Sequence, residues 1–381
     1  RQTFAPSAPF DMEPFMTVRD IFDTMSYGPA PESNAEALAW LAKHKGQFGH
    51  WINGAFAAAG ETFATHNPAT GDMLALVTQG SAADVDRAIA AARRAQPKWA
   101  KLSGHQRAKY LYALARLVQK HSRLLAVLET MDNGKPIREA RDIDVPLVAR
   151  HFYYHAGLAQ LLASEQPGMQ ALGVCGAVIP WNFPLLMLAW KVAPALAAGN
   201  TVVLKPSEKD PSASIWIAKL WKEAGLPDGV FNVLNGDKES VDGLLTSPDV
   251  ESISFVGSTP IAQYIYETAS RSGKRVQALG GAKNHMLVLP DADLELVADS
   301  AINAGFGSAG ERCMAISVVV AVEPVADKLI PKIVERMSKL RTGDGRRGCD
   351  MGPLVTKEHR DKVASYIEIA EKDGATVVVD G

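Results

Sequence analysis

The sequence predicts an α/β protein built on a doubly wound parallel sheet, followed by an incomplete second α/β domain. From Leu172 onward, short apolar segments alternate with segments of helical periodicity. The apolar segments are continuous rather than alternating, which is typical of parallel strands covered on both faces by helices. At 381 residues with 47% hydrophobic content, the chain is long enough to bury two hydrophobic cores.

The first half of the chain predicts mostly helices. An N-terminal extension, residues 1–45, is followed by short strands in HWINGAF and THNPATGDMLALV. Serine caps and apolar residues at helical spacing then mark the helices. We expect them at Glu36–Lys43, from a cap at Ser81 to just before Pro97, and at Ser103–Lys120, Leu124–Asp132 and Asp142–Gln160.

Strands and helices alternate from residue 172 to 284, and they complete a dinucleotide-type domain over residues 46–284. The expected strands are GVCGAVIP, NTVVLKP, VFNVLNG, SISFVGS and RVQALG, with helices at Leu185–Ala198, Pro211–Ala224, Glu239–Leu245 and Pro260–Ser272. Residues 285–381 should form the first part of a catalytic domain. Its expected elements are strands at Met286–Leu289 and Ile316–Val320, the latter buried, a helix at Val325–Leu340, and a last helix and strand within Lys357–Val379. The chain begins at Arg1 and stops just after a strand-like run, so we expect this domain to be truncated.

Composition argues against several classes of protein. The net charge of −2 gives no reason to expect nucleic acid or an anionic membrane as a partner. Cys175, Cys313 and Cys349 are too widely spaced for a disulfide framework or a zinc site, which suits a reducing compartment. No apolar run reaches the ~20 residues of a membrane span, and no signal-peptide pattern is present. These two features predict a cytoplasmic protein. His151 and His155 lie one turn apart without a third ligand in the sequence, so we expect no bound metal.

Cys313 is the cysteine best placed to act as a nucleophile. Small residues and glycines from Gly305 to Gly310 precede it and let backbone approach a substrate closely. The neighbouring Arg312 is expected to lower the thiol pKa and so to increase the thiolate fraction. The alternative is an inert cysteine buried in the core.

Two strand ends carry signals for a nucleotide cofactor. Lys205, Ser207 and Glu208 end the second strand, at the edge where open α/β sheets bind ligands. A lysine and a carboxylate can hold ribose hydroxyls, and the carboxylate repels a 2′-phosphate, which favours NAD over NADP. Gly257 and Ser258 end the fourth strand, where the next helix can present N–H groups to a pyrophosphate. Each motif alone also occurs at strand ends that bind nothing.

Asn182 follows the first strand, in Pro-Trp-Asn-Phe-Pro. A side-chain amide aimed at a developing alkoxide stabilises it most in a dry site, and the loss of one such donor costs roughly 3 kcal/mol. The alternative is an asparagine that only turns the chain before Pro184. The residues alone leave both open.

Taken together, these motifs resemble the aldehyde dehydrogenase superfamily over nearly the whole chain. SYGPAPES and ALAWL near the N-terminus resemble the family-16 enzymes, whereas GERCMA and GAKNH resemble the CoA-acylating methylmalonate-semialdehyde dehydrogenases. The resemblance implies a homodimer or homotetramer that uses NAD and acts on an aldehyde. It also implies site roles: Cys313 as nucleophile, Asn182 as oxyanion donor, Arg312 for a substrate carboxylate, and Pro180, Trp181, Lys205, Ser207, Glu208, Gly257 and Ser258 for NAD.

The chain departs from the superfamily pattern at two site positions. Where hydrolytic members have a glutamate that activates water, this chain has Ala278 or Leu279. Where the semialdehyde branch has a second arginine for the substrate carboxylate, this chain has Val145. The first departure favours CoA over water as the acyl acceptor. Three alternatives stay open: hydrolysis with Glu311 or a carboxylate beyond the C-terminus as base, a non-catalytic oligomer-forming relative, and a binding module with Cys313 buried.

Overall fold

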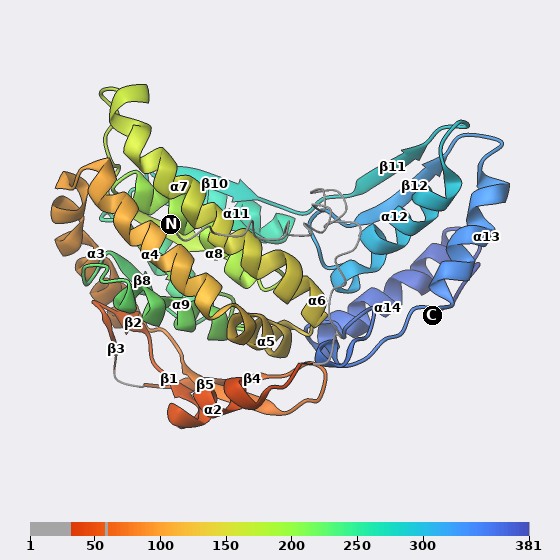
Figure 1. Cartoon of the computed structure of the whole chain (residues 1–381), viewed down its shortest axis with the longest axis horizontal. Coiled ribbons are helices and arrows are strands. Elements are labelled where there is room, and N and C mark those ends of the chain that lie inside the picture. Colours follow the sequence, from red (N-terminus) through yellow and green to blue (C-terminus); the bar gives the residue numbers. More distant parts are fainter. Residues whose placement is uncertain (1–31, 58–59, 381) are drawn as a thin grey trace, which may run out of the picture.

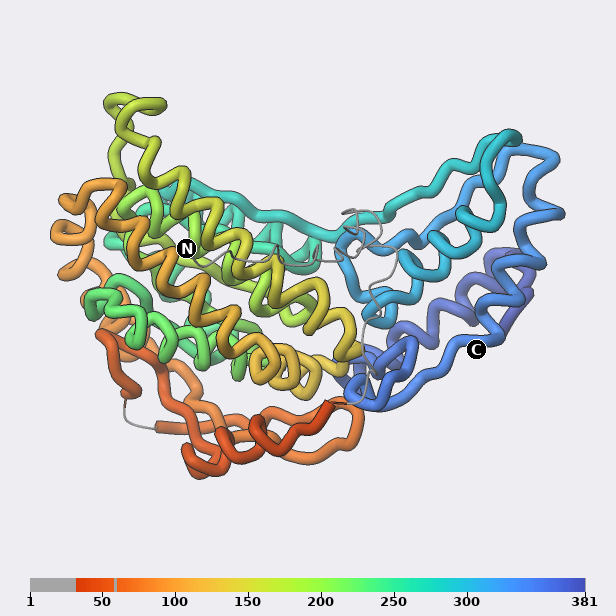
Figure 2. Tube along the Cα trace, in the orientation of Figure 1, coloured from red at the N-terminus to blue at the C-terminus, as the bar shows by residue number. Residues whose placement is uncertain are grey.

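The computed structural model describes residues 32–57 and 60–380, which form two lobes (Figure 1). The larger lobe contains the main sheet between layers of helices, and the smaller lobe contains the last strands and helices. Figure 2 shows the chain crossing from one lobe to the other after the main sheet is complete. Most of the expected N-terminal extension lies outside the described residues. Its helix is present as α2, Ala35–Lys43.

The main sheet has the strand order β10-β9-β6-β7-β8-β2-β3. Its first five members are parallel, which confirms the predicted doubly wound fold. The chain runs from β6 outward to β7 and β8, then returns to the other side of β6 for β9 and β10, so a topological switch point lies between β6 and β9. The bounds are β6 Val174–Val178, β7 Thr201–Lys205, β8 Phe231–Val233, β9 Ser252–Val256 and β10 Arg275–Leu279, with β2 Trp51–Ile52 and β3 Ala55–Phe56 added antiparallel.

Helices cover both faces of this sheet, as the continuous apolar strands predicted. One face packs against α3 Ala82–Lys101, α10 Lys238–Thr246 and α11 Thr259–Arg271. The other packs against α8 Pro184–Ala197 and α9 Ser212–Glu223, which are backed by α4 Gly104–Lys120, α5 Ser122–Asn133 and α7 Val145–Glu165. Fully buried side chains such as Leu111, Leu188 and Trp221 fill this second core. Burying a large apolar side chain contributes about 1.5–3 kcal/mol, so these layers hold the sheet rigidly.

Helix α3 is longer than the sequence predicts. Ser81 caps it in a reciprocal capping box with Asp84, as expected. The helix then continues through Pro97 to Lys101 instead of ending before the proline. Trp99 explains the difference, because its buried indole donates to the carbonyl of Leu196 over 3.1 Å. This tertiary contact outweighs the helix hydrogen bond that proline removes.

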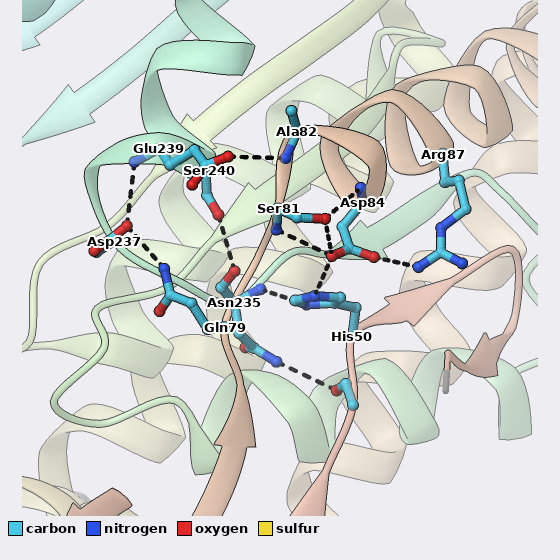
Figure 3. Close-up of polar contacts among 11 residues, drawn as sticks. His50, Gln79, Ser81, Ala82, Asp84, Arg87, Asn235, Asp237, Glu239 and Ser240 are labelled. Carbon is cyan, nitrogen blue, oxygen red and sulfur yellow. Dashed lines mark hydrogen bonds and ion pairs between the residues drawn. The ribbon is translucent and has the colours of Figure 1, made fainter. Parts of the chain in front are cut away.

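A buried polar network ties the start of α3 to the carboxyl edge of the sheet (Figure 3). His50 Nδ1 accepts from Asn235 N–H over 3.1 Å, and His50 Nε2 lies 3.5 Å from Asp84 Oδ2. Burial opposes ionisation of Asp84, but hydrogen bonds from Ser81 and Arg87 lower its pKa to about 2. The network joins three segments that are distant in sequence, and it holds the loop after β8 in place.

A three-stranded sheet, β1-β5-β4, lies below the main sheet beside α2. Its strands are β1 Gln47–Phe48, β4 Thr62–His66 and β5 Met73–Thr78. Of the helices in the described residues, none combines the length and the apolar character that crossing a membrane requires.

The smaller lobe corrects three expectations. Its two parallel strands, β11 Asn284–Val288 and β12 Ile316–Ala321, are covered on one face by α12 Leu294–Phe306 and α13 Ala326–Met337. Helix α12 was not expected. β12 is only half-buried rather than buried, because the described residues cover only one of its faces. After α14, Lys357–Lys372, the described residues 376–380 pair with no strand, although their sequence is strand-like.

A cluster of buried charges supports the end of α5. Lys135 Nζ lies 3.0 Å from Glu129 Oε1 and 2.5 Å from Asp144 Oδ2, and all three side chains are buried. Asp132 accepts hydrogen bonds from Ser212 N–H and Ser212 Oγ over 2.9 and 3.0 Å, which ties α5 to the start of α9. Burial raises the pKa of Asp132 to about 7 despite these two hydrogen bonds. The folded chain therefore holds a proton on Asp132 that the unfolded chain has already released above its ordinary pKa of 3.8.

Asp132→Asn should flatten the pH dependence of stability. Between about pH 4 and pH 7 the folded state binds more protons than the unfolded state, so the free energy of unfolding falls as pH rises, by up to about 1.4 kcal/mol per pH unit for one group. Urea unfolding at pH 5, 6, 7 and 8 measures the slope in the wild type and in the variant. Asp86→Asn, at an exposed position of α3, is the control. An equal slope in wild type and D132N would contradict the assignment.

Candidate active site

Three motifs meet at the carboxyl edge of the main sheet. Trp181 follows β6, Lys205 ends β7 and Gly257 follows β9. Since these strands are parallel neighbours in the order β9-β6-β7, their ends lie side by side at the topological switch point. The structure thus brings together the segments that the sequence assigned to the cofactor.

The Lys205 and Glu208 pair fits a ribose site. Lys205 Nζ lies 3.0 Å from Glu208 Oε2. The Lys205 side chain is buried, whereas the Glu208 side chain is 47% exposed and can reach a ligand. Burial opposes ionisation of Glu208, but the Lys205 ammonium lowers its pKa, which keeps the carboxylate charged at neutral pH. Ser207 is buried, and its Oγ accepts from Lys209 N–H over 3.1 Å within the loop. Ser207 therefore shapes this loop.

The start of α11 fits a pyrophosphate. Ser258 is the N-cap residue of α11, and its side chain makes no capping hydrogen bond, so the first N–H groups of the helix remain available to an anion. Gly257 fits only as glycine, because an added Cβ would come within 2.4 Å of the Phe255 ring. These contacts fit a dinucleotide at this edge.

The loop that carries Cys313 has a strained backbone. Ser308 and Ala309 have φ values of 48° and 53°, and Gly310 has 74°. The left-handed conformation costs roughly 1–2 kcal/mol for each residue with a Cβ, so the surroundings must hold the loop in this shape.

Four hydrogen bonds from three distant residues hold this loop. Glu139 Oε1 accepts from Ser308 N–H over 2.9 Å, and Asn182 Nδ2 donates to the Glu311 carbonyl over 2.6 Å. Asn284 Nδ2 donates to the carbonyls of Cys313 and Ala315, each over 2.9 Å. The three anchors come from α6 Ile137–Glu139, from the β6–α8 loop and from the start of β11.

Asn182 lies beside the nucleophile loop, as the oxyanion role requires. One N–H of its amide donates to the Glu311 carbonyl, and the second has no acceptor among the described residues. The preceding Trp181 is held by Asn133, whose Nδ2 donates to the Trp181 carbonyl over 3.3 Å. In the described part of the chain no acceptor contacts the Cys313 N–H, so this donor is also available. Asn182 therefore does more than turn the chain before Pro184, and its oxyanion role stays a prediction.

The three cysteines differ in accessibility. Cys313 is exposed, whereas Cys349 is buried and Cys175 is partly buried. Burial raises the thiol pKa of both Cys175 and Cys349. The binding-module alternative expected a buried Cys313, and the structure contradicts that expectation.

Arg312 points to Glu139, which the sequence reasoning did not single out. Arg312 Nε and Nη2 lie 3.2 and 2.5 Å from Glu139 Oε2. The Glu139 side chain is only 7% exposed, so it is a buried carboxylate that balances the arginine. Because Glu139 lies on a helix of only three residues, no helical periodicity in the sequence marks it. Only the folded structure shows which groups it contacts.

The side chain of Glu311, adjacent to Arg312, contacts residues at the start of α14. Its Oε1 accepts from Val355 N–H over 3.3 Å and lies 3.9 Å from His359 Nε2. Burial raises the pKa of Glu311 to about 8, so the group is mostly protonated at pH 7. Burial also lowers the pKa of His359, so both groups are largely neutral there.

The segment that replaces the water-activating glutamate contains no acid. Ala278 and Leu279 lie at the end of β10, and the preceding Gln277 accepts from Ser254 Oγ over 3.1 Å.

His151, considered above as a metal ligand, instead accepts from Trp190 Nε1 over 2.6 Å.

Comparisons with known proteins agree with this geometry. Residues 56–381 match the model of the aldehyde dehydrogenase family. The chain is 43% identical over 345 residues to malonate-semialdehyde dehydrogenase 1 of Geobacillus thermodenitrificans, a match that covers 87% of this chain and 70% of that protein. A malonate-semialdehyde dehydrogenase of Pseudomonas aeruginosa is 43% identical over 350 residues, covering 88% of this chain and 70% of its own length. The likeness is thus not confined to the second half of the chain.

Solved structures give the same result. Methylmalonate-semialdehyde dehydrogenase of Oceanimonas doudoroffii superposes with a TM-score of 0.84 at 43% identity, covering 88% of this chain and 71% of that one. The NAD+ complex of an aldehyde dehydrogenase from Bacillus cereus superposes with a TM-score of 0.87 at 35% identity, covering 92% and 74%.

Iodoacetamide should label Cys313 well before the other two cysteines, because only Cys313 is exposed and the other thiols have raised pKa values. Peptide mapping of the labelled protein measures the order. Cys313→Ala should remove the fast phase, and Cys349→Ala should leave it unchanged. Faster labelling of Cys349 or Cys175 would contradict the assignment.

Proposed function

The chain belongs to the aldehyde dehydrogenase family, and on that premise we propose that it oxidises an aldehyde with NAD through a thioester on Cys313. The observation that carries this proposal is the contact between Asn182 and the Glu311 carbonyl. It brings a side-chain amide from the carboxyl edge of the sheet to the loop of an exposed thiol. A nucleophile and an oxyanion donor are thereby close to the edge that fits the cofactor.

In the first step, the Cys313 thiolate attacks the aldehyde carbon, and the carbonyl electron pair moves to oxygen. The free N–H of Asn182 and the Cys313 backbone N–H stabilise this oxyanion. Because their positions are held before the substrate arrives, little reorganisation is needed as charge develops.

Lys205, Glu208 and Ser258 would hold NAD, which accepts the hydride from the substrate carbon when bound. Loss of that hydride restores the carbonyl and leaves an acyl group in thioester linkage to Cys313. The contacts of Asn284 and Glu139 keep the loop in place while this bond exists.

We propose CoA as the acyl acceptor, because the hydrolytic base position holds Ala278 or Leu279. Water at neutral pH needs a base, which typically contributes ~10²–10⁴-fold, whereas a thiol is more nucleophilic and partly ionised. The CoA thiolate adds to the acyl carbon, and the Cys313 thiolate leaves. Glu311 is poorly placed to replace the missing base, since it faces Val355 and is mostly protonated at pH 7.

We further propose a semialdehyde as the substrate and a homodimer or homotetramer in the cytoplasm as the working form. The similarity to proteins named malonate- and methylmalonate-semialdehyde dehydrogenases supports this substrate class. Arg312 is the residue beside the nucleophile that can meet the carboxylate of such a substrate.

Glu208→Gln should weaken the preference for NAD over NADP. The wild-type carboxylate repels a 2′-phosphate, and removing one partly exposed charge is worth about fivefold in relative kcat/KM. Steady-state NADH and NADPH production measure the ratio, with Glu223→Gln, an exposed position at the end of α9, as the matched control. A wild type that uses both cofactors equally would show that Glu208 has no such role.

NADH formation should require CoA for sustained turnover. Without CoA, the wild type should give a burst no larger than the amount of enzyme, because the thioester on Cys313 accumulates. With CoA, NADH and acyl-CoA should form in equal amounts, and Glu311→Gln should preserve this behaviour. Equal steady-state rates without CoA, with a free acid as product, would favour hydrolysis, and loss of that hydrolysis in E311Q would identify Glu311 as its base.

A further inference from the structure

A charged groove lies beside the nucleophile loop. It has a volume of about 610 Å³ and runs between the two lobes, with Phe306 and Gly307 on one side. Four arginines line it, and every one has a carboxylate partner. The pairs are Arg138 with Asp350, Arg341 with Asp350, Arg141 with both Asp142 and Glu32, and Arg312 with Glu139.

The Glu139 pair differs from the others in its contact with the nucleophile loop. Its carboxylate is nearly inaccessible to solvent, as is that of Glu32, but Glu139 also accepts from the Ser308 backbone. Its two oxygens also have separate tasks. Oε1 accepts from the Ser308 backbone, and Oε2 accepts from Arg312. Glu139 thus holds both ends of the strained segment that precedes Cys313.

The position of the Arg312 guanidinium is restricted further by Gly307. A Cβ at residue 307 would come within 2.5 to 2.7 Å of the guanidinium atoms, so the group packs directly on the glycine backbone. Nε and Nη2 are used by Glu139, while Nη1 has no acceptor among the described residues. The Nη1 group of Arg312 is therefore left for a ligand in the groove.

We propose that Glu139 is a positioning residue that makes the site selective for aldehydes carrying a carboxylate. Glu139 binds Nε and Nη2 of Arg312, so that Nη1 faces the carboxylate of the substrate. Its negative charge also balances that of the arginine. The preference for anionic aldehydes then depends on the direction of the Nη1 donors rather than on net charge. The substrate class rests on the proposed function. The role of Glu139 toward Arg312 rests on the contacts alone.

Alkylation of Cys313 tests this without any turnover. Iodoacetate and iodoacetamide react in the same way: sulfur attacks the CH₂ carbon, an S–C bond forms and iodide leaves. They differ in that iodoacetate carries a carboxylate close to the reacting carbon. The ratio of their rates at Cys313, measured by mass spectrometry on the full chain, therefore reports how well Arg312 is placed for an anion.

Glu139→Gln should lower this ratio roughly tenfold, the size of one charge-assisted hydrogen bond. A glutamine oxygen still accepts from Ser308 N–H, so the iodoacetamide rate should stay within about twofold of the wild type, as the loop keeps its main-chain anchor. Its NH₂ group cannot pair with Arg312, so only the anion-dependent rate falls.

Asp350→Asn is the matched control, because it removes the same charge from the same groove without touching the nucleophile loop. If net charge governed the ratio, both variants would raise it. If the direction of Arg312 governs it, E139Q lowers the ratio and D350N does not. An unchanged or raised ratio in E139Q, or an equal fall in D350N, overturns the proposal.

Arg312→Lys serves if E139Q does not fold. A lysine keeps the charge but cannot make the two-nitrogen contact, so the same fall in the ratio is expected. Steady-state kinetics with succinate semialdehyde and propanal then extend the test, with a higher KM in E139Q for the semialdehyde only. Absence of NADH with both aldehydes in the wild type would reject the proposed function, while the alkylation ratio would still decide the role of Glu139.

Discussion

The left-handed turn before Cys313 is the constraint on which the site depends. Ser308 and Ala309 occupy a conformation that residues with a Cβ disfavour. Glu139 binds this turn directly, and Asn182 and Asn284 bind the residues that follow it. The thiol of Cys313 is exposed in this arrangement, in contrast to the buried Cys349. Rigid anchors on both sides keep the thiol and the donors in one arrangement.

Each of the three residues that anchor the loop is positioned by a neighbouring helix or strand. Asn182 follows a central strand of the main sheet, and Asn284 is the first residue of β11. Glu139 follows Lys135, whose buried ammonium is paired with Glu129 and Asp144. Breaking a buried pair of this kind is strongly destabilising, because it leaves an uncompensated charge. These buried pairs lie in the segment that leads into the short helix α6, from which Glu139 reaches the loop in the smaller lobe.

The alternation of elements and the serine caps were sufficient to predict the main sheet, because burial on both faces imposes continuous apolar strands. The same reasoning failed where a long-range contact decides the outcome. The hydrogen bond of Trp99 stabilises α3 beyond Pro97, and β12 is half-exposed because the described residues of the smaller lobe cover one of its faces. In the site, the residue types of Cys313 and Asn182 were enough to single them out, and the structure places Asn182 at the loop that carries Cys313. Glu139 was not singled out in this way, since a buried acid is identified only by the two groups that it binds in space.

The carboxyl groups near the nucleophile loop are poorly suited to activate water for hydrolysis of a thioester. Glu139 Oε1 accepts from Ser308 N–H, and Oε2 pairs with Arg312, so both oxygens hold the loop. Glu311 is mostly protonated at pH 7 and accepts from Val355 N–H, so little of it is the ionised carboxylate that a base requires. Among the described residues that contact the nucleophile loop, the acids therefore serve to hold the loop. A thioester formed there is best released by an acceptor that brings its own nucleophilicity, which a thiol does and water does not.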